Sequence, residues 1–202
     1  MSRQARSSDY RLIQIVDSAL ADSARRSGEW LACRPGCAQC CVGVFAINQL
    51  DASRLRQGLA DLEKRDRERA AMVRVRARRS WLRLMPDFPG DAVSGLLSDS
   101  EQSKLDFSNF ANDEPCPALD PLTQTCDLYG ARPLTCRVFG PPVRSEDGLG
   151  TCELCFHGAT ESEIAECEML VDPDDIESKL VQQVEQDLGV SGHTIVAFSL
   201  AS

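Results

Sequence analysis

The 202-residue sequence is poor in aromatic side chains and in histidine, and it has no long apolar run. Phe, Trp and Tyr make up only 5% of the residues, so the apolar core is expected to be modest and to benefit from a bound metal. No apolar stretch approaches the roughly 20 residues of a membrane-spanning helix. The first nine residues carry charges without the apolar segment that a secretory signal requires. We therefore expect a cytoplasmic protein that does not associate with a membrane.

The sequence patterns of common enzyme classes are also missing. There is no HExxH motif, no glycine-rich phosphate loop and no Ser/His/Asp pattern of a hydrolase. The sequence therefore identifies no catalytic residue, and its chemistry has to be sought in its ten cysteines.

Nine of these cysteines lie in two groups between residues 33 and 155. The upstream group is Cys33-Arg-Pro-Gly-Cys37-Ala-Gln-Cys40-Cys41, and the downstream group is Cys116, Cys126, Cys136, Cys152 and Cys155. Because cytoplasmic thiols are kept reduced, this number favours metal ligation over structural disulfides. Thiolates are soft ligands that select zinc, iron–sulfur clusters or copper(I). We predict that all nine bind metal, whereas Cys167, on a predicted helix, is expected to be a buried thiol without a metal.

The spacing within the two groups is typical of metal-binding turns. Cys37-x2-Cys40 and Cys152-x2-Cys155 each place two ligands in one small chelate ring, and the gap from Cys33 to Cys37 is close to that spacing. The neighbours Cys40 and Cys41 point to opposite sides of an extended backbone. They therefore suggest either two metal positions or one ligand beside a spare thiol. One centre and two four-ligand centres both remain open, and spacing does not separate zinc from iron–sulfur.

Three arginines are candidates for compensating the charge of a thiolate centre. Four thiolates around zinc or a [4Fe–4S]²⁺ cluster leave a net charge of about −2. Arg34, Arg132 and Arg137 each lie within four residues of a cysteine, and we expect them to face a centre. Ordinary surface salt bridges are the alternative. His157, two residues after Cys155, is a less favoured substitute ligand.

A basic stretch separates the two cysteine groups. Residues 54–83 carry 11 basic and 4 acidic side chains, whereas residues 84–202 carry 5 basic and 22 acidic ones. The favoured interpretation is that the basic stretch folds against the acidic remainder. A surface for nucleic acid or another acidic partner and a merely solvated helix are the alternatives.

Apolar side chains at helical spacing predict several helices. We expect an amphipathic helix over 9–27, a helical stretch over 51–84 that is continuous or broken near 64–69, a helix over 161–170 with Thr160 and Glu163 as a capping box, and a helix from Asp172 to Leu188. The shorter elements that we expect are a strand or helix start at 42–47, brief helices near 98–105 and 127–131, and an apolar end at 194–200 that is a strand or packed coil.

These elements predict a mainly α fold, with a small, irregular, cysteine-rich metal-binding core flanked by amphipathic helices. The expected organisation is an N-terminal helix at 1–32 and a cysteine-cluster metal-binding domain at 33–157 that includes the basic helix of about 51–84. C-terminal helices at 158–202 are expected to pack on the same domain.

Motifs in the downstream group resemble a known family. They are Cys116-Pro-Ala-Leu119, Cys126-Asp-Leu-Tyr129 and Arg132-Pro-Leu-Thr-Cys136-Arg-Val-Phe139. After a Cys-Cys pair, this order of CPxL, CxxY, RPxxC and RxF resembles the YkgJ-type CxxCxxCC family, whose members are described as zinc- or iron-chelating. The first gap, from Cys33 to Cys37, is one residue longer than in the signature.

The resemblance covers about residues 33–157, and it implies metal binding by Cys37, Cys40, Cys41, Cys116, Cys126 and Cys136. It also adds Tyr129 to the residues expected around a centre. Flagellin lysine methylases are similar over the cysteine block, which favours iron–sulfur over zinc. Methylation is not implied, because the chain has no glycine-rich S-adenosylmethionine loop.

Three functions remain open from the sequence. The favoured one is a cytoplasmic metal-binding protein with one or two Cys-ligated centres, a structural or redox-sensing role, and a protein or redox partner. The second is an iron–sulfur-dependent oxidoreductase or modification enzyme, which needs an open coordination position or a reactive thiol such as Cys33 or Cys41. The third is a zinc-stapled interaction module that uses the basic helix.

Overall fold

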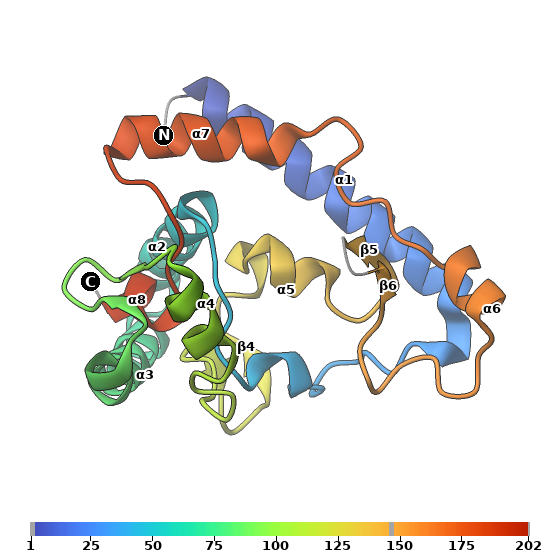
Figure 1. Ribbon diagram of the computed structural model, residues 1–202, viewed down its shortest axis with the longest axis horizontal. Helices are drawn as coiled ribbons and strands as arrows, with labels where there is room; N and C mark the ends of the chain where they lie inside the picture. The colour runs from blue at the N-terminus through green and yellow to red at the C-terminus, as the bar shows by residue number, and fades with distance from the viewer. Residues whose placement is uncertain (1–2, 146–147, 202) are drawn as a thin grey trace. The chain divides into compact units, whose positions relative to one another are not determined.

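The computed structural model describes residues 3–145 and 148–201, and helices supply most of its regular structure (Figure 1). The chain divides into two compact units, each made of two separate segments: 1–37 with 134–187, and 38–133 with 188–202. The predicted mainly α fold is confirmed, since strands in the described ranges occur only as two-stranded pairs. No helix in those ranges is long and apolar enough to cross a membrane.

The first unit begins with its longest helix, α1 (Arg3–Ser27). Leu12 and Val16 on its apolar stripe are fully buried, as the predicted helix over 9–27 requires, but the helix starts six residues earlier. It ends at Gly28, whose φ of +51° lies in the left-handed region that favours glycine, and the short 3₁₀ turn η1 (Gly28–Trp30) follows. The Ser23 hydroxyl donates to the Cys167 carbonyl (2.5 Å), so α1 is tied to a distant part of the chain.

The second segment of the first unit is less regular. It contains α5 (Leu134–Val138), the pair β5 (Val143–Ser145) and β6 (Gly148–Gly150), α6 (Glu161–Glu166) and α7 (Ile176–Leu188). The predicted capping box of Thr160 and Glu163 is confirmed at the start of α6. α7 begins later than predicted because the Asp172 carboxylate accepts from the backbone N–H groups of Ile176 and Glu177, which places the helix start at Ile176.

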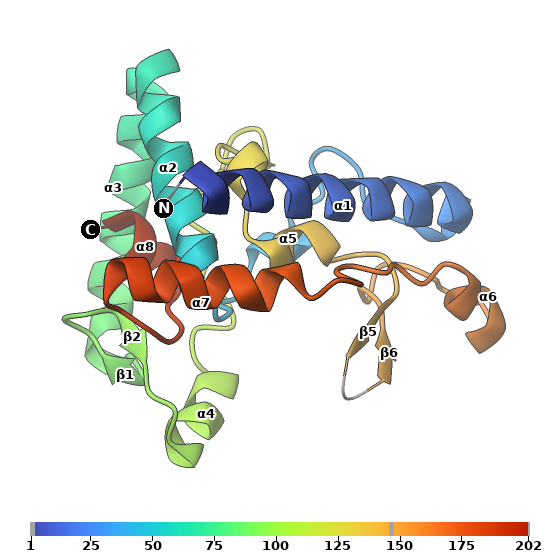
Figure 2. The same cartoon turned by 90° about the horizontal axis from the view of Figure 1, so that it is seen from above.

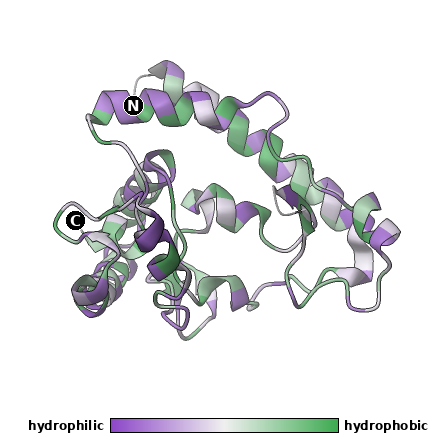
Figure 3. Cartoon of the chain, viewed as in Figure 1, coloured by the Kyte–Doolittle hydropathy of each residue, from purple (hydrophilic) through white to green (hydrophobic). Residues whose placement is uncertain are grey.

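The second unit is built on two neighbouring helices, α2 (Gln49–Arg65) and α3 (Arg67–Leu84), drawn side by side in Figure 2. The predicted break is confirmed at Asp66, whose side chain caps α3 by accepting from the Arg69 backbone N–H (3.0 Å). The N-cap of α2 is Asn48, so the helix begins two residues before the predicted bound of 51. Hydrophilic and apolar positions alternate along α3 (Figure 3), and its buried side chains join a core with α2 and α8 (Val196–Ala201).

α8 corrects the prediction of a strand or packed coil at 194–200. Five of its six residues are buried against α2 and α3, so tertiary packing selects the helix there. Residues 42–47 form neither a strand nor a helix start. They make two isolated bridges instead, from Val42 to Pro115 and from Ile47 to Thr194. The remaining elements of the second unit are η2 (Gln39–Cys41), η3 (Met85–Asp87), β1 (Gly90–Asp91), β2 (Leu96–Leu97), α4 (Glu101–Ser108), β3 (Leu119–Asp120), β4 (Thr125–Cys126) and η4 (Tyr129–Ala131).

Within the second unit, six of the eleven basic side chains at 54–83 form ion pairs with carboxylates. Ion pairs join Arg54 to Asp51, Lys64 to Asp61, Arg69 and Arg76 to Asp127, Arg74 to Glu63, and Arg83 to Glu114. The pairs of Arg69 and Arg76 with Asp127 and of Arg83 with Glu114 support the interpretation that the basic stretch folds against the acidic remainder, whereas the other three pairs are local to α2 and α3.

Candidate metal centres

Four thiols gather in the first unit, and we call them the first thiol cluster: Cys33, Cys37, Cys152 and Cys155. Cys33 and Cys155 hydrogen-bond through their side chains, and Cys37 and Cys152 lie within electrostatic range of Cys33. Cys33 as a residue is exposed, but partial desolvation of its thiol, followed by the proximity of the other thiols, raises its pKa to about 12. The pKa of Cys152 is also raised, first by burial. Raised pKa values are the opposite of what a reactive free thiol needs, whereas a bound cation would favour the thiolates.

Backbone geometry holds the first thiol cluster together. The Cys155 N–H donates to the Cys152 carbonyl (2.9 Å), which closes the Cys-x2-Cys turn, and the Leu154 N–H donates to the Cys152 sulfur. Gly140 lies directly against Cys33: a Cβ there would stand 2.6 Å from the Cys33 sulfur, and the φ of Gly140 is +123°. The chain therefore needs glycine at this position for both space and conformation. Sequence reasoning missed Gly140, although it directly follows the RxF motif.

A second set of four thiols lies in the second unit, and we call it the second thiol cluster: Cys40, Cys41, Cys116 and Cys126. The Cys41 thiol donates to Cys40, which lowers the pKa of Cys40 to about 6 and raises that of Cys41. Burial raises the pKa of Cys116 to about 12 and also raises that of Cys126. The adjacent Cys40 and Cys41 thus hydrogen-bond to each other and belong to one cluster.

Three backbone features bring the second thiol cluster together from distant parts of the sequence. The Cys116 N–H donates to the Cys41 carbonyl (2.7 Å), and the β3–β4 hairpin pairs Leu119 with Cys126. The N–H groups of Ala118 and Leu128 donate to the sulfurs of Cys116 and Cys126, respectively. These donors stabilise the thiolate form, the form that binds metal.

Arg132 supplies positive charge to the second thiol cluster. Its guanidinium attracts the thiolate forms of Cys40 and Cys126, which adds to the effect of the Cys41 hydrogen bond in lowering the pKa of Cys40 and partly opposes the rise that burial causes in the pKa of Cys126. It also stacks 3.8 Å from the centre of the Tyr129 ring. Its buried Nε has no hydrogen-bond partner in the described residues. The side chain thus has a donor to offer to a thiolate or sulfide. Tyr129 is largely exposed, and its contact in this region is with the Arg132 guanidinium, so its role around a centre stays a prediction.

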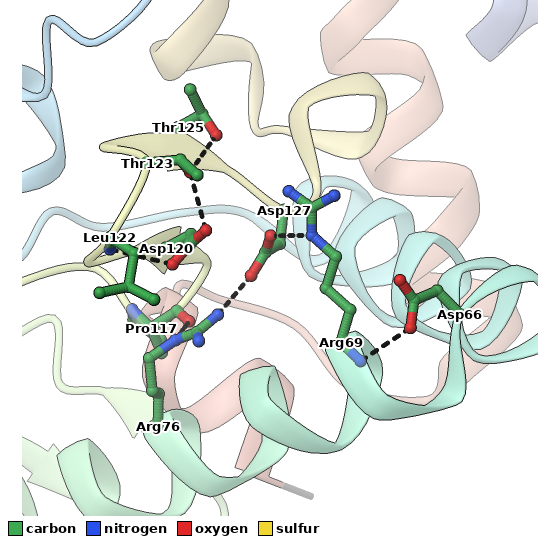
Figure 4. A network of polar contacts seen from close by, with 9 residues as sticks. All are labelled: Asp66, Arg69, Arg76, Pro117, Asp120, Leu122, Thr123, Thr125 and Asp127. Carbon is green, nitrogen blue, oxygen red and sulfur yellow. Dashed lines mark hydrogen bonds and ion pairs between the residues drawn. The ribbon is translucent and has the colours of Figure 1, made fainter.

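Figure 4 shows a polar network that anchors the loop carrying Cys126 to α3. The Asp127 carboxylate, whose side chain is 1% exposed, accepts from Arg69 and Arg76. Arg76 also donates to the Pro117 carbonyl (2.8 Å), next to Cys116. The basic helix therefore holds both loops of the second thiol cluster, a role that the sequence did not predict.

The donor set of each cluster suits zinc or an iron–sulfur cluster, because both take four cysteine thiolates. In the described residues, no three Cys, His, Asp or Glu side chains already stand at the spacing of a metal-coordination shell. The thiols of each cluster are hydrogen-bonded or electrostatic neighbours. Ligation would therefore draw the sulfurs together by side-chain adjustment within a backbone that already gathers them.

The other predicted site residues lie outside these two sets. Cys136 is on α5, and its assignment as a ligand stays a prediction. The neighbouring Arg137 is 4% exposed and donates to Asp17 of α1 (2.7 Å). The side chains of Arg34 and His157 are exposed. Cys167, predicted to be buried on a helix, is buried at the C-cap of α6 and packs in an apolar cluster with Cys152 and Cys155.

A family model described as "CxxCxxCC: Putative zinc- or iron-chelating domain" matches residues 32–156. The chain belongs to this family. The matched span includes all eight thiols of the two clusters and Cys136, so membership supports a cysteine-rich metal-binding domain that takes zinc or iron. No curated protein and no solved structure matches the chain significantly.

Proposed function

We propose that this CxxCxxCC protein is a cytoplasmic metal-binding protein with two Cys₄ centres, one formed by each thiol cluster. The observation that carries the proposal is the separation of eight thiols into two sets of four, each contained in one unit. Four thiolates saturate a tetrahedral zinc ion or the irons of a [4Fe–4S] cluster. Saturated ligation favours a structural, electron-transfer or sensing role over direct catalysis at the metal.

Iron–sulfur is the preferred occupant. The resemblance of the cysteine block to flagellin lysine methylases favours it, and Arg132 offers a buried donor beside the second thiol cluster. Hydrogen bonds and positive charge next to the sulfurs are the features by which proteins tune cluster potentials. When bound, such a cluster supplies one-electron redox chemistry. Zinc would supply folding energy alone.

The basic helix is disfavoured as a nucleic-acid surface, because six of the eleven cations at 54–83, including Arg69, Arg76 and Arg83, are held by carboxylates of the second unit. Non-specific binding to nucleic acid requires cations that are free to neutralise phosphates.

The test is iron, zinc and acid-labile sulfide analysis of the full chain purified without oxygen. We expect iron and sulfide in similar amounts, with visible absorbance. Cys155→Ser and Cys116→Ser are each expected to remove one centre and to leave the other, because the two sets do not share a thiol. Cys167→Ala is the matched control: it removes a buried thiol of the first unit that is in neither set.

Each outcome bears on a separate part of the proposal. Full metal content in Cys116→Ser would contradict the assignment of the second thiol cluster. Loss of all metal in either variant would contradict two separate centres. Zinc without sulfide in the wild type would overturn the preference for iron–sulfur and leave the two Cys₄ sites in place.

A further inference from the structure

A cavity in the second unit lies apart from the thiol clusters. Its volume is about 380 Å³, which is in the range of small-molecule sites, and no cysteine lines it. Residues of α2, α3, α8 and the β1–β2 turn form its walls. The walls are mixed: Trp81 and Phe198 are aromatic, and Gln49, Arg56 and Arg78 are polar.

The polar side chains of the walls fall into two classes. Gln49, Ser94 and Ser199 donate to backbone carbonyls of the second unit. Arg56 and Arg78, in contrast, have no carboxylate partner within residues 3–145 and 148–201. Five other arginines of α2 and α3 are paired with carboxylates, whereas the arginines without such a pair that line this cavity are Arg56 and Arg78. They are the groups of the cavity that remain available to a ligand.

The two arginines differ in how they are held. The Arg78 guanidinium stacks 4.3 Å from the centre of the Trp81 ring, which limits its movement and leaves its N–H edge available. The Arg56 side chain is exposed, but neighbouring atoms remove part of its hydration, which lowers its pKa because no carboxylate in the described residues compensates for that loss. An anion in the cavity would compensate that charge.

The apolar side of the cavity indicates the rest of the ligand. Trp81 packs edge-on against Phe198, with ring centres 6.3 Å apart, and Leu96, Leu188 and Val190 continue the apolar surface. A bare inorganic anion would leave this surface in water. A ligand with an apolar body would cover it and gain burial energy as well as charge pairing.

We propose that this cavity is a binding site for a small organic anion, in which Arg56 and Arg78 hold a carboxylate or phosphate head and Trp81 and Phe198 contact an apolar body. This site is independent of the metal centres. The protein then binds two classes of ligand: a metal at the thiol clusters and a small organic anion at this cavity.

The test uses isothermal titration calorimetry with the metal-containing full chain. The probes are phenylacetate, phenyl phosphate, benzyl alcohol and inorganic phosphate. We expect the two aromatic anions to bind. Benzyl alcohol, which lacks the anionic head, and inorganic phosphate, which lacks the apolar body, should each bind at least about tenfold more weakly. The stronger of the two aromatic anions identifies the head group as carboxylate or phosphate.

Matched variants connect binding to this cavity. Arg56→Gln and Arg78→Gln are expected to weaken the better anion about tenfold, whereas Arg79→Gln, on the same helix but outside the cavity, should leave it unchanged. All three side chains are exposed, so circular dichroism should show an unchanged fold. A Trp30→Phe background isolates Trp81 as the remaining tryptophan, whose fluorescence should respond to the ligand.

The proposal is overturned by any of three results. Equal binding of benzyl alcohol would show an apolar cavity without anion recognition. Equal weakening by Arg79→Gln would show an effect of net charge alone. The absence of binding of both aromatic anions at millimolar concentration would show that the arginines do not form a site.

Discussion

Replacement of Arg76 by glutamine tests the network that holds the second thiol cluster. Arg76 lies on α3 with a side chain that is 19% exposed. It donates to the buried Asp127 carboxylate and to the Pro117 carbonyl, so it contacts the loops of both Cys126 and Cys116. Without the Arg76 guanidinium, the remaining ion pair of Asp127 is with Arg69. The Arg69 side chain is 45% exposed, so water screens that pair.

The size of the expected stability loss follows from the burial of the Asp127 carboxylate. A hydrogen bond to a charged group contributes about 1.5–3 kcal/mol, and a buried carboxylate that loses a partner costs several kcal/mol more if no other cation remains. Because Arg69 remains, we expect Arg76→Gln to lower the free energy of unfolding by about 2–3 kcal/mol. Arg74→Gln is the matched control on the same helix. Its ion pair with Glu63 is about half exposed on both sides, so the expected loss is about 0.5 kcal/mol or less.

Urea denaturation followed by far-UV circular dichroism measures both values, and transfer of metal to a chelator measures the effect on the centre. Arg76→Gln should release metal faster from the second thiol cluster, because its two loops are no longer held to α3. An equal loss of stability in Arg76→Gln and Arg74→Gln would refute the reasoning. So would unchanged metal release in a destabilised Arg76→Gln variant, since the network would then not act on the thiols.

Three other variants test separate features. Gly140→Ala is expected to displace the Cys33 sulfur and to deplete metal from the first thiol cluster alone. Its control is Gly158→Ala, at a left-handed position with open space, which should cost about 1 kcal/mol of backbone strain without metal loss. Full metal content in Gly140→Ala would contradict the close contact. Arg132→Gln removes positive charge beside the second thiol cluster, so chelator competition should show weaker metal binding at that cluster and unchanged metal binding at the first. Equal weakening of metal binding at both clusters would contradict this placement of Arg132. Thr160→Ala removes the capping box of α6 and should lower the free energy of unfolding by about 1 kcal/mol in urea titrations. Thr160→Ser keeps the capping hydroxyl and should be close to wild type. Equal losses of stability in both variants would exclude the cap as the cause.

Features with a local physical cause were predictable from the sequence. The capping box of Thr160 and Glu163 needs only residues three apart, and the helix break at Asp66 needs only a polar residue between two apolar stripes. The family motifs are also local, and they correctly indicated a metal-binding domain. Even the stop of α1 at Gly28 follows from the conformational freedom of one residue.

Features that depend on distant contacts were decided by tertiary structure. Cys37 and Cys40 have the spacing of one chelating turn, yet they lie in different units and in different thiol clusters. Sequence spacing limits which thiols can approach each other. The backbone hydrogen bonds that Cys116 donates to Cys41 and that Cys152 donates to Gly140 determine which of them do. Burial likewise made α8 a helix where the local sequence favoured a strand or coil. The sequence alone thus determined that this protein belongs to a cysteine-rich family of zinc- or iron-chelating domains, whereas long-range packing decided how eight of its cysteines divide into two sets of four.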